Sequence, residues 1–122
     1  MTTVVDRFSE HLTDIELPKN QNSLWQVAGL IKDRTNVKYK FDVRDMIIRG
    51  NNTFEKHFSS KSNADKVVFE TGNKWVIFDV KEILDFINKN KTKILHIEDL
   101  ISKLEWNIVL PKNKYIFNII HI

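Results

Sequence analysis

The sequence predicts an α+β fold: a single domain over residues 1–122, with a mixed or antiparallel sheet packed by about four helices. Two stretches, 65–80 and 106–121, each hold a pair of apolar runs separated by turn residues, as β-hairpins do. Residues 36–43 alternate apolar with polar side chains, which is typical of a half-buried strand. Other apolar residues recur at helical spacing. With 122 residues, 42% of them hydrophobic, the chain is long enough to bury a core.

Two amphipathic helices are expected before the first strand. Residues 3–14 space their apolar side chains by three and four positions, with acids between them. Residues 23–34 repeat the pattern after Asn22 or Ser23, either of which is a good N-cap. The positions expected to face the core are Val4, Val5, Phe8, Leu12 and Ile15 in the first helix, and Leu24, Val27, Ala28 and Ile31 in the second.

The strand 36–43 should have an apolar inner face and a basic outer face that includes Lys38 and Lys40. After residue 43 the periodic pattern of apolar residues weakens. A short helix is expected to end at Gly50, and a helical turn to run from about Thr53 to Phe58.

The hairpin 65–80 consists of the apolar runs VVF and WVIF, joined across Thr71-Gly72-Asn73. A helix over residues 80–90 should follow at once, because Asp79 and Glu82 have the spacing of a capping box. A further helix is expected over 97–105.

The second hairpin joins WNIVL to KYIFNIIHI through a turn at Pro111. Its last strand is apolar on both faces, so it must lie inside a sheet or be covered by a partner. We therefore expect a protein partner or self-association at this strand. The residues predicted to form that interface are Tyr115, Phe117, Ile120 and Ile122.

Composition narrows the function classes. The chain has no cysteine, so disulfides and thiolate metal sites are excluded. Its three glycines do not form a nucleotide-binding loop, and we expect no cofactor. No apolar run approaches the roughly 20 residues of a membrane span, and the first residues do not resemble a signal peptide. These features predict an intracellular protein, in the cytoplasm or nucleus of a host. The abundance of Lys, Asn and Ile is typical of AT-rich genomes such as those of phages and large viruses.

One motif could carry chemistry. Asp65 stands at the start of the first hairpin strand, and Asp79-Val80-Lys81 ends the second. Two carboxylates and a nearby cation are what a Mg²⁺-dependent nuclease needs. The segment ADKVVFETGNKWVIFDVK resembles the core hairpin of the PD-(D/E)XK nucleases, including Holliday-junction resolvases. That resemblance implies metal and catalytic roles for Asp65, Asp79 and Lys81, with Glu10 or Glu55 as the family's helical glutamate.

The register of the hairpin favours another interpretation of the motif. A two-residue Gly72-Asn73 turn pairs Thr71 with Lys74 and sets Asp65 on the face opposite to Asp79. Asp79 would then be a helix cap and Lys81 a surface charge in the first helical turn.

Nucleic-acid binding is a further expectation. Residues 32–66 hold nine Lys or Arg against five Asp or Glu, although the net charge of the whole chain is only +3. This distribution permits contact with a nucleic-acid backbone. The candidate residues are Lys38, Lys40, Arg44, Arg49, Lys56 and Lys61.

The sequence therefore favours a small, non-enzymatic intracellular binding module that acts through a protein partner or a nucleic-acid backbone. The alternative is the Mg²⁺-dependent nuclease.

Overall fold

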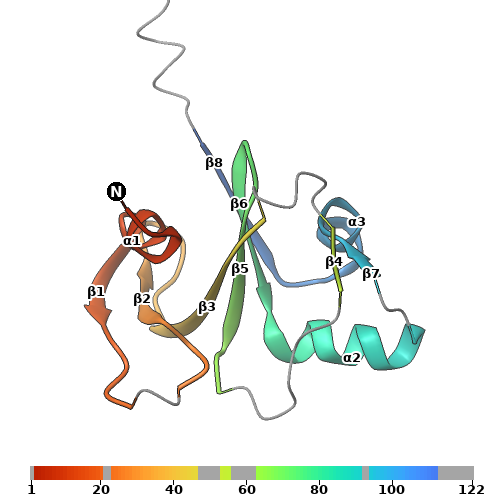
Figure 1. The fold of residues 1–122 in the computed structure, drawn as a ribbon, viewed down its shortest axis with the longest axis horizontal. Helices are drawn as coiled ribbons and strands as arrows, with labels where there is room; N and C mark the ends of the chain where they lie inside the picture. The colour runs from red at the N-terminus through yellow and green to blue at the C-terminus, as the bar shows by residue number, and fades with distance from the viewer. Residues whose placement is uncertain (1, 21–22, 47–52, 56–62, 92–93, 113–122) are drawn as a thin grey trace, which may run out of the picture.

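In the computed structural model, residues 2–20, 23–46, 53–55, 63–91 and 94–112 are described. Six of the strands form one curled sheet in the order β1-β2-β3-β5-β6-β8 (Figure 1). All neighbouring pairs in it are antiparallel except β3 and β5, which run parallel. These strands are β1 (Leu12–Glu16), β2 (Val27–Ile31), β3 (Tyr39–Asp45), β5 (Lys66–Glu70), β6 (Lys74–Asp79) and β8 (Asn107–Pro111).

Three short helices and a small second sheet cover the two faces of the large sheet. α1 (Val4–Ser9) places Phe8 in the core of one face. On the other face lie α2 (Val80–Asn90), α3 (Ile97–Lys103) and the antiparallel pair formed by β4 (Thr53–Glu55) and β7 (Ile94–His96). Figure 1 shows α1 at one side of the molecule and α2 and α3 at the other.

The central hairpin is buried on both of its faces. Along β5, Val67 and Phe69 join the core under α2 and α3, whereas Val68 joins the core under α1. Strand β6 divides its side chains in the same way, because successive side chains of a strand point to opposite faces. The hairpin expected over 65–80 is thus present, and both cores are built on it.

The prediction of a sheet made of two hairpins and one strand, packed by about four helices, is wrong. The structure has six strands in one mixed sheet and three short helices among the described residues. The predicted helix 3–14 ends at Ser9 and continues as β1, and the predicted helix 23–34 is replaced by β2. Short apolar runs such as Val27–Ile31 fit a strand buried on both faces as well as a helix, so their spacing misled the prediction.

Smaller corrections concern the middle of the chain. The strand predicted over 36–43 begins later, at Tyr39, and extends to Asp45. Residues 53–55 form β4 instead of a helical turn. The rest of the predicted turn, and the short helix ending at Gly50, lie outside the described residues.

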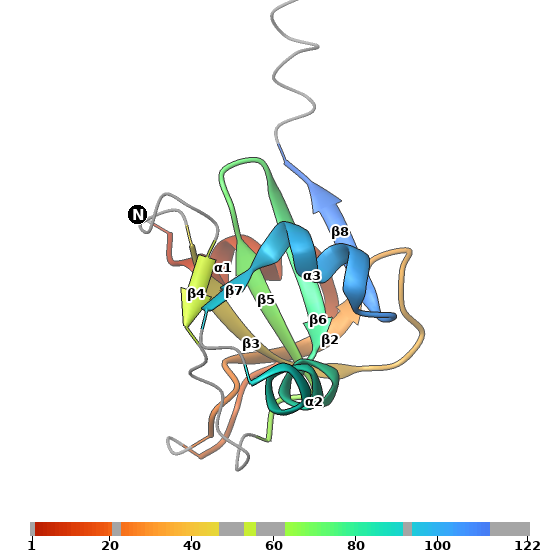
Figure 2. The same cartoon turned by 90° about the vertical axis from the view of Figure 1, so that its right-hand side faces the viewer.

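The C-terminal elements agree better with the sequence patterns. α2 and α3 are where they were expected. β8 lies where the first strand of the second hairpin was predicted, but it extends through Pro111, where the turn was expected. The second strand of that hairpin lies outside the described residues. Strand β8 pairs with β6 on one side and forms a border of the sheet (Figure 2).

Candidate functional site

The register of the central hairpin separates the two acids of the D…DxK motif. The Thr71 N–H donates to the Lys74 carbonyl at 2.9 Å, so the turn has two residues, as predicted. Lys66 lies opposite Asp79, and the Val80 N–H donates to the Asp65 carbonyl at 3.1 Å. Since side chains alternate along a strand, Asp65 and Asp79 leave opposite faces of the sheet.

Asp79 uses both of its carboxylate oxygens within the fold. One accepts a hydrogen bond from the Glu82 N–H at 3.0 Å, which makes Asp79 the N-cap of α2. The other accepts from Lys66 Nζ at 2.9 Å. The expected capping box is not reciprocal, because the Glu82 carboxylate instead accepts from the N–H groups of Glu105 and Trp106 at 2.7 and 3.1 Å. Glu82 thereby ties α2 to the segment that leads into β8.

The three residues of the motif do border one open hollow of about 450 Å³ at the end of the hairpin. Asp65 is exposed, and one of its oxygens accepts from the Lys40 N–H at 2.9 Å. Lys81 is exposed in the first turn of α2. Asp65 and Asp79 point to opposite faces of the sheet and both Asp79 oxygens accept hydrogen bonds, so this pair of acids fits Mg²⁺ poorly. No three His, Cys, Asp or Glu side chains gather to hold a metal in the described parts of the chain. We therefore derive no metal-dependent step.

Lys66 is the residue of this region that the sequence analysis missed. It is 6% exposed, and its ammonium lies 3.7 Å from the Trp106 ring centroid and 4.5 Å from that of Tyr39. With Asp79, the two rings surround the charge with favourable contacts. Register could have found this pair, because a two-residue turn after Thr71 places Lys66 opposite Asp79 and on the same face.

Of the predicted nucleic-acid contacts, Lys38 is held by two carboxylates of β1. Its ammonium lies 3.0 Å from Glu16 and 3.8 Å from Asp14. The hydrogen bond from Lys38 lowers the pKa of Glu16, and the same bond raises the pKa of Lys38. Lys38 therefore already has two carboxylate partners at the surface.

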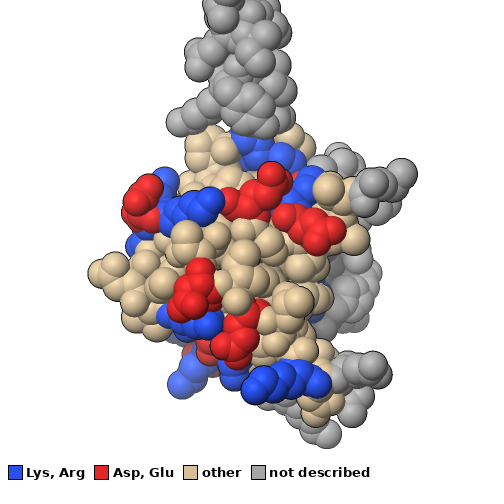
Figure 3. All heavy atoms as spheres, turned by 90° about the vertical axis from the view of Figure 1, so that its left-hand side faces the viewer, with Lys and Arg blue, Asp and Glu red and all other residues tan. Residues whose placement is uncertain are grey.

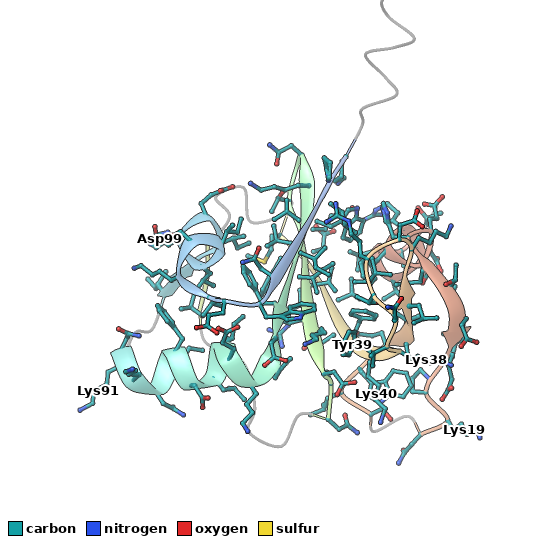
Figure 4. All side chains as sticks on the ribbon, turned by 180° about the vertical axis from the view of Figure 1, so that it is seen from behind. Lys19, Lys38, Tyr39, Lys40, Lys91 and Asp99 are labelled. Atoms are coloured by element: carbon teal, nitrogen blue, oxygen red, sulfur yellow. The ribbon has the colours of Figure 1, made fainter. Side chains whose placement is uncertain are left out.

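Arg44 and Lys40 are the other predicted basic contacts that the structure describes. Arg44 pairs with Asp42 at 2.9 Å, and Lys40 lies 5.7 Å from the Trp25 ring centroid. Lys40 and Lys38 lie near Lys19 at one end of the sheet (Figure 4). On the face that carries α1 and β1, acidic and basic side chains alternate and neither sign forms a large area (Figure 3). Arg49, Lys56 and Lys61 lie outside the described residues.

A buried acid at the opposite end of β5 also escaped the sequence analysis. The side chain of Glu70 is fully buried and accepts hydrogen bonds from Arg7 at 2.7 and 2.9 Å and from Lys112 at 3.1 Å. Burial alone raises the pKa of Glu70, but the hydrogen bonds from Arg7 and Lys112 outweigh it, and the pKa lies below 4.5. This cluster fastens α1 and the end of β8 to the central strand.

The predicted partner residues Tyr115, Phe117, Ile120 and Ile122 lie outside the described residues. The strand that precedes them, β8, is described and has an open outer edge: no other described strand pairs with it there. Its residues from Asn107 to Pro111 carry no charge. The side chains of Ile108 and Val109 are only partly buried.

The hydrogen-bond register fixes which backbone groups of β8 point outward. The Lys112 N–H donates to the Asn73 carbonyl opposite it at 3.0 Å. In an antiparallel pair, hydrogen-bonded positions alternate with positions whose N–H and C=O point away from the partner. Ile108 and Leu110 therefore bond to β6, whereas Asn107, Val109 and Pro111 direct their backbone groups to the open edge. Because proline lacks a backbone N–H, Pro111 presents only its carbonyl at the open edge.

No helix among the described residues is long and apolar enough to cross a membrane. Comparison of the chain with protein-family models, with curated proteins and with solved structures finds no match.

Proposed function

We propose that this chain is a small non-enzymatic binding module, working inside the cell, that takes up an extended strand of a protein partner at the open edge of β8. The observation that carries the proposal is the set of outward backbone groups on an uncharged, regular strand. Addition of a strand to such an edge is a common mode of peptide recognition, in which main-chain hydrogen bonds supply affinity.

The other border of the sheet supports the proposal by contrast. Strand β1 carries the exposed acids Asp14 and Glu16, and its register shifts between Thr13 and Glu16. Asp14 also has a left-handed backbone, with φ of 54°. Charges and bulges are the usual protection of an edge against unwanted pairing. β8 has no charge and no bulge along Asn107–Pro111, and its one protective residue is Pro111 at the end of the strand.

The sequence after β8 extends the proposed interface. Tyr115, Phe117, Ile120 and Ile122 follow Pro111 in the last eleven residues of the sequence. In the proposal these side chains add apolar contacts to the backbone hydrogen bonds of the edge. Aromatic and aliphatic anchors of this kind commonly dominate the energy of an interface.

The bonds in the candidate site support a binding role over the nuclease alternative. Both Asp79 oxygens already accept hydrogen bonds within the fold, and Asp65 points to the other face of the sheet. Binding through Lys38 and Arg44 to a nucleic-acid backbone is weakly supported, since both cations already have carboxylate partners.

The test compares two substitutions at Val109. Val109→Pro removes the outward N–H and no hydrogen bond to β6, so it should block partner pairing while the β6-β8 hydrogen bonds are kept. Val109→Thr, of similar shape, keeps that N–H and is the matched control. Tagged full-length chains are used to capture partners from the native host, and cross-linking with mass spectrometry maps the contact. We expect a partner cross-linked at β8 that Val109→Thr retains and Val109→Pro loses. A partner held equally by both variants would contradict the proposal.

A further inference from the structure

The open edge of β8 is complementary to itself. We propose that the strand it takes up is β8 of a second copy of this chain, so that two sheets join across a two-fold axis at Val109. This inference rests on the proposed function, and it names the partner.

The backbone groups of the edge match under this symmetry. With Val109 opposite its counterpart, each Val109 N–H meets the other Val109 carbonyl. Asn107 then lies opposite Pro111 of the second copy, and its N–H donates to that proline's carbonyl. Every outward N–H of Asn107 and Val109 therefore finds an acceptor. Because Pro111 of the second copy has no N–H, the Asn107 carbonyl opposite it is the one outward group left unpaired. This carbonyl can bind water.

The side chains match as well. A two-fold axis perpendicular to the sheet keeps each face continuous between the two copies. Val109 pairs with its counterpart on the face of α2 and α3, and Ile108 pairs with Leu110 of the second copy on the other face. Apolar cross-strand pairs of this kind stabilise an antiparallel sheet. Ile108 and Val109, which are partly exposed at the edge, would become covered.

The charge pattern favours a second copy at β8 and disfavours one at β1. Symmetric pairing places like residues close together, so any charge on the edge would repel itself. β8 is uncharged from Asn107 to Pro111, whereas β1 would bring Asp14 and Glu16 of two copies together. Like charges directly opposite one another destabilise a strand pair.

Sedimentation of the full-length chain from micromolar to millimolar concentration tests the inference. We expect dimers for the wild type and for Val109→Thr. Val109→Lys and Val109→Glu should each weaken association about tenfold or more, because like charges meet at the axis. An equimolar mixture of these two variants should associate again, because the symmetric site then pairs opposite charges. This recovery is expected only if residue 109 of one copy lies next to residue 109 of the other.

Circular dichroism and thermal unfolding establish that each variant is folded before association is measured. If the charged variants do not fold, Val109→Pro replaces them and should be monomeric. A monomeric wild type, a dimer indifferent to these substitutions, or a mixture that stays monomeric would overturn the inference. A monomeric wild type that captures a different protein, and loses it with Val109→Pro, would overturn the second copy and leave the proposed function standing. If Val109→Pro changes neither self-association nor the capture of another protein, both the second copy at β8 and the proposed function are overturned.

Discussion

Asp79 has two structural roles, one for each of its carboxylate oxygens. It caps α2 and it compensates the charge of Lys66, whose side chain is 7% exposed. An apolar cage of Tyr39 and Trp106 around that ammonium makes the ion pair part of the core. The residue that would have been a metal ligand therefore acts as an anchor between β5, β6 and α2.

Substitutions at Asp79 should separate these two roles. Asp79→Asn keeps a capping oxygen but loses the ion pair, and should lower the free energy of unfolding by about 1–2 kcal/mol. Asp79→Ala also removes the cap, and should cost about 3 kcal/mol in total. Adding Lys66→Met to Asp79→Ala should recover part of the loss, because the unpaired buried charge disappears. Urea denaturation of the variants measures the differences. Equal stability of the Asn and Ala variants would contradict the capping role.

Glu70 makes stability depend on pH. Because its pKa is lowered by folding, the ionised form stabilises the native state above pH 4.5, and this contribution is lost as pH falls through the lowered pKa. Glu70→Gln should lower the free energy of unfolding by about 3 kcal/mol at neutral pH, since Arg7 and Lys112 lose their charged acceptor.

The difference between wild type and Glu70→Gln, measured by denaturation at several pH values, should therefore shrink below pH 4.5. A difference that stays constant from neutral to acidic pH would show that the charge of Glu70 does not matter. Arg7→Lys is a useful control, because it keeps the positive charge and loses the double hydrogen bond.

At the scale of elements, the pairing of β1 with β2 is the main departure from the sequence prediction. Gly29 lies in the middle of β2, where an added Cβ would approach the Thr13 carbonyl oxygen to 2.9 Å and Leu12 Cβ to 3.3 Å. A side chain at this position therefore forces the two strands apart. In the predicted helix 23–34 the same position would have no such restriction.

Gly29→Ala distinguishes the two structures of this segment. In the strand pair it should destabilise the protein by about 1–3 kcal/mol, because the clash is with backbone. In a helix, alanine would instead stabilise by about 1 kcal/mol relative to glycine. Thermal or urea unfolding gives the sign directly. A gain in stability would contradict the β1-β2 pairing.

The elements that could be predicted are those with a strong local signal. The hairpin 65–80 has a turn sequence between two apolar runs, and α2 has a cap followed by a clear apolar face. β2 lacked such a signal, because a strand buried on both faces shows no alternation. Long-range pairs such as Arg7 with Glu70 depend on the order of strands in the sheet, which local patterns do not contain.

The candidate site was likewise predictable in part from local sequence patterns. Turn length alone predicted that Asp65 and Asp79 leave opposite faces, and the structure confirms it. The ion pairs of Lys38 could not be predicted, because they join β1 to residues just before β3, and β1 was expected to be part of a helix.

In the described part of the molecule, the large sheet has one protected border, β1, and one open border, β8. Its buried charged side chains, Asp42, Lys66 and Glu70, are each paired with an opposite charge, and its central strands are buried on both faces. The proposed site of recognition is the regular, uncharged edge of β8, which no other described strand covers. The proposed function therefore depends on whether that edge takes up another strand.

Hydrogen exchange of single amides tests this most directly. The N–H groups of Ile108 and Leu110 bond to β6 and should exchange slowly at every protein concentration. The Val109 N–H points to the open edge, so it should exchange rapidly in dilute protein and slowly as concentration rises or partner is added. A Val109 amide that is fast under all these conditions would show that no strand binds there. One that is slow even at high dilution would show that the edge is already covered within a single chain.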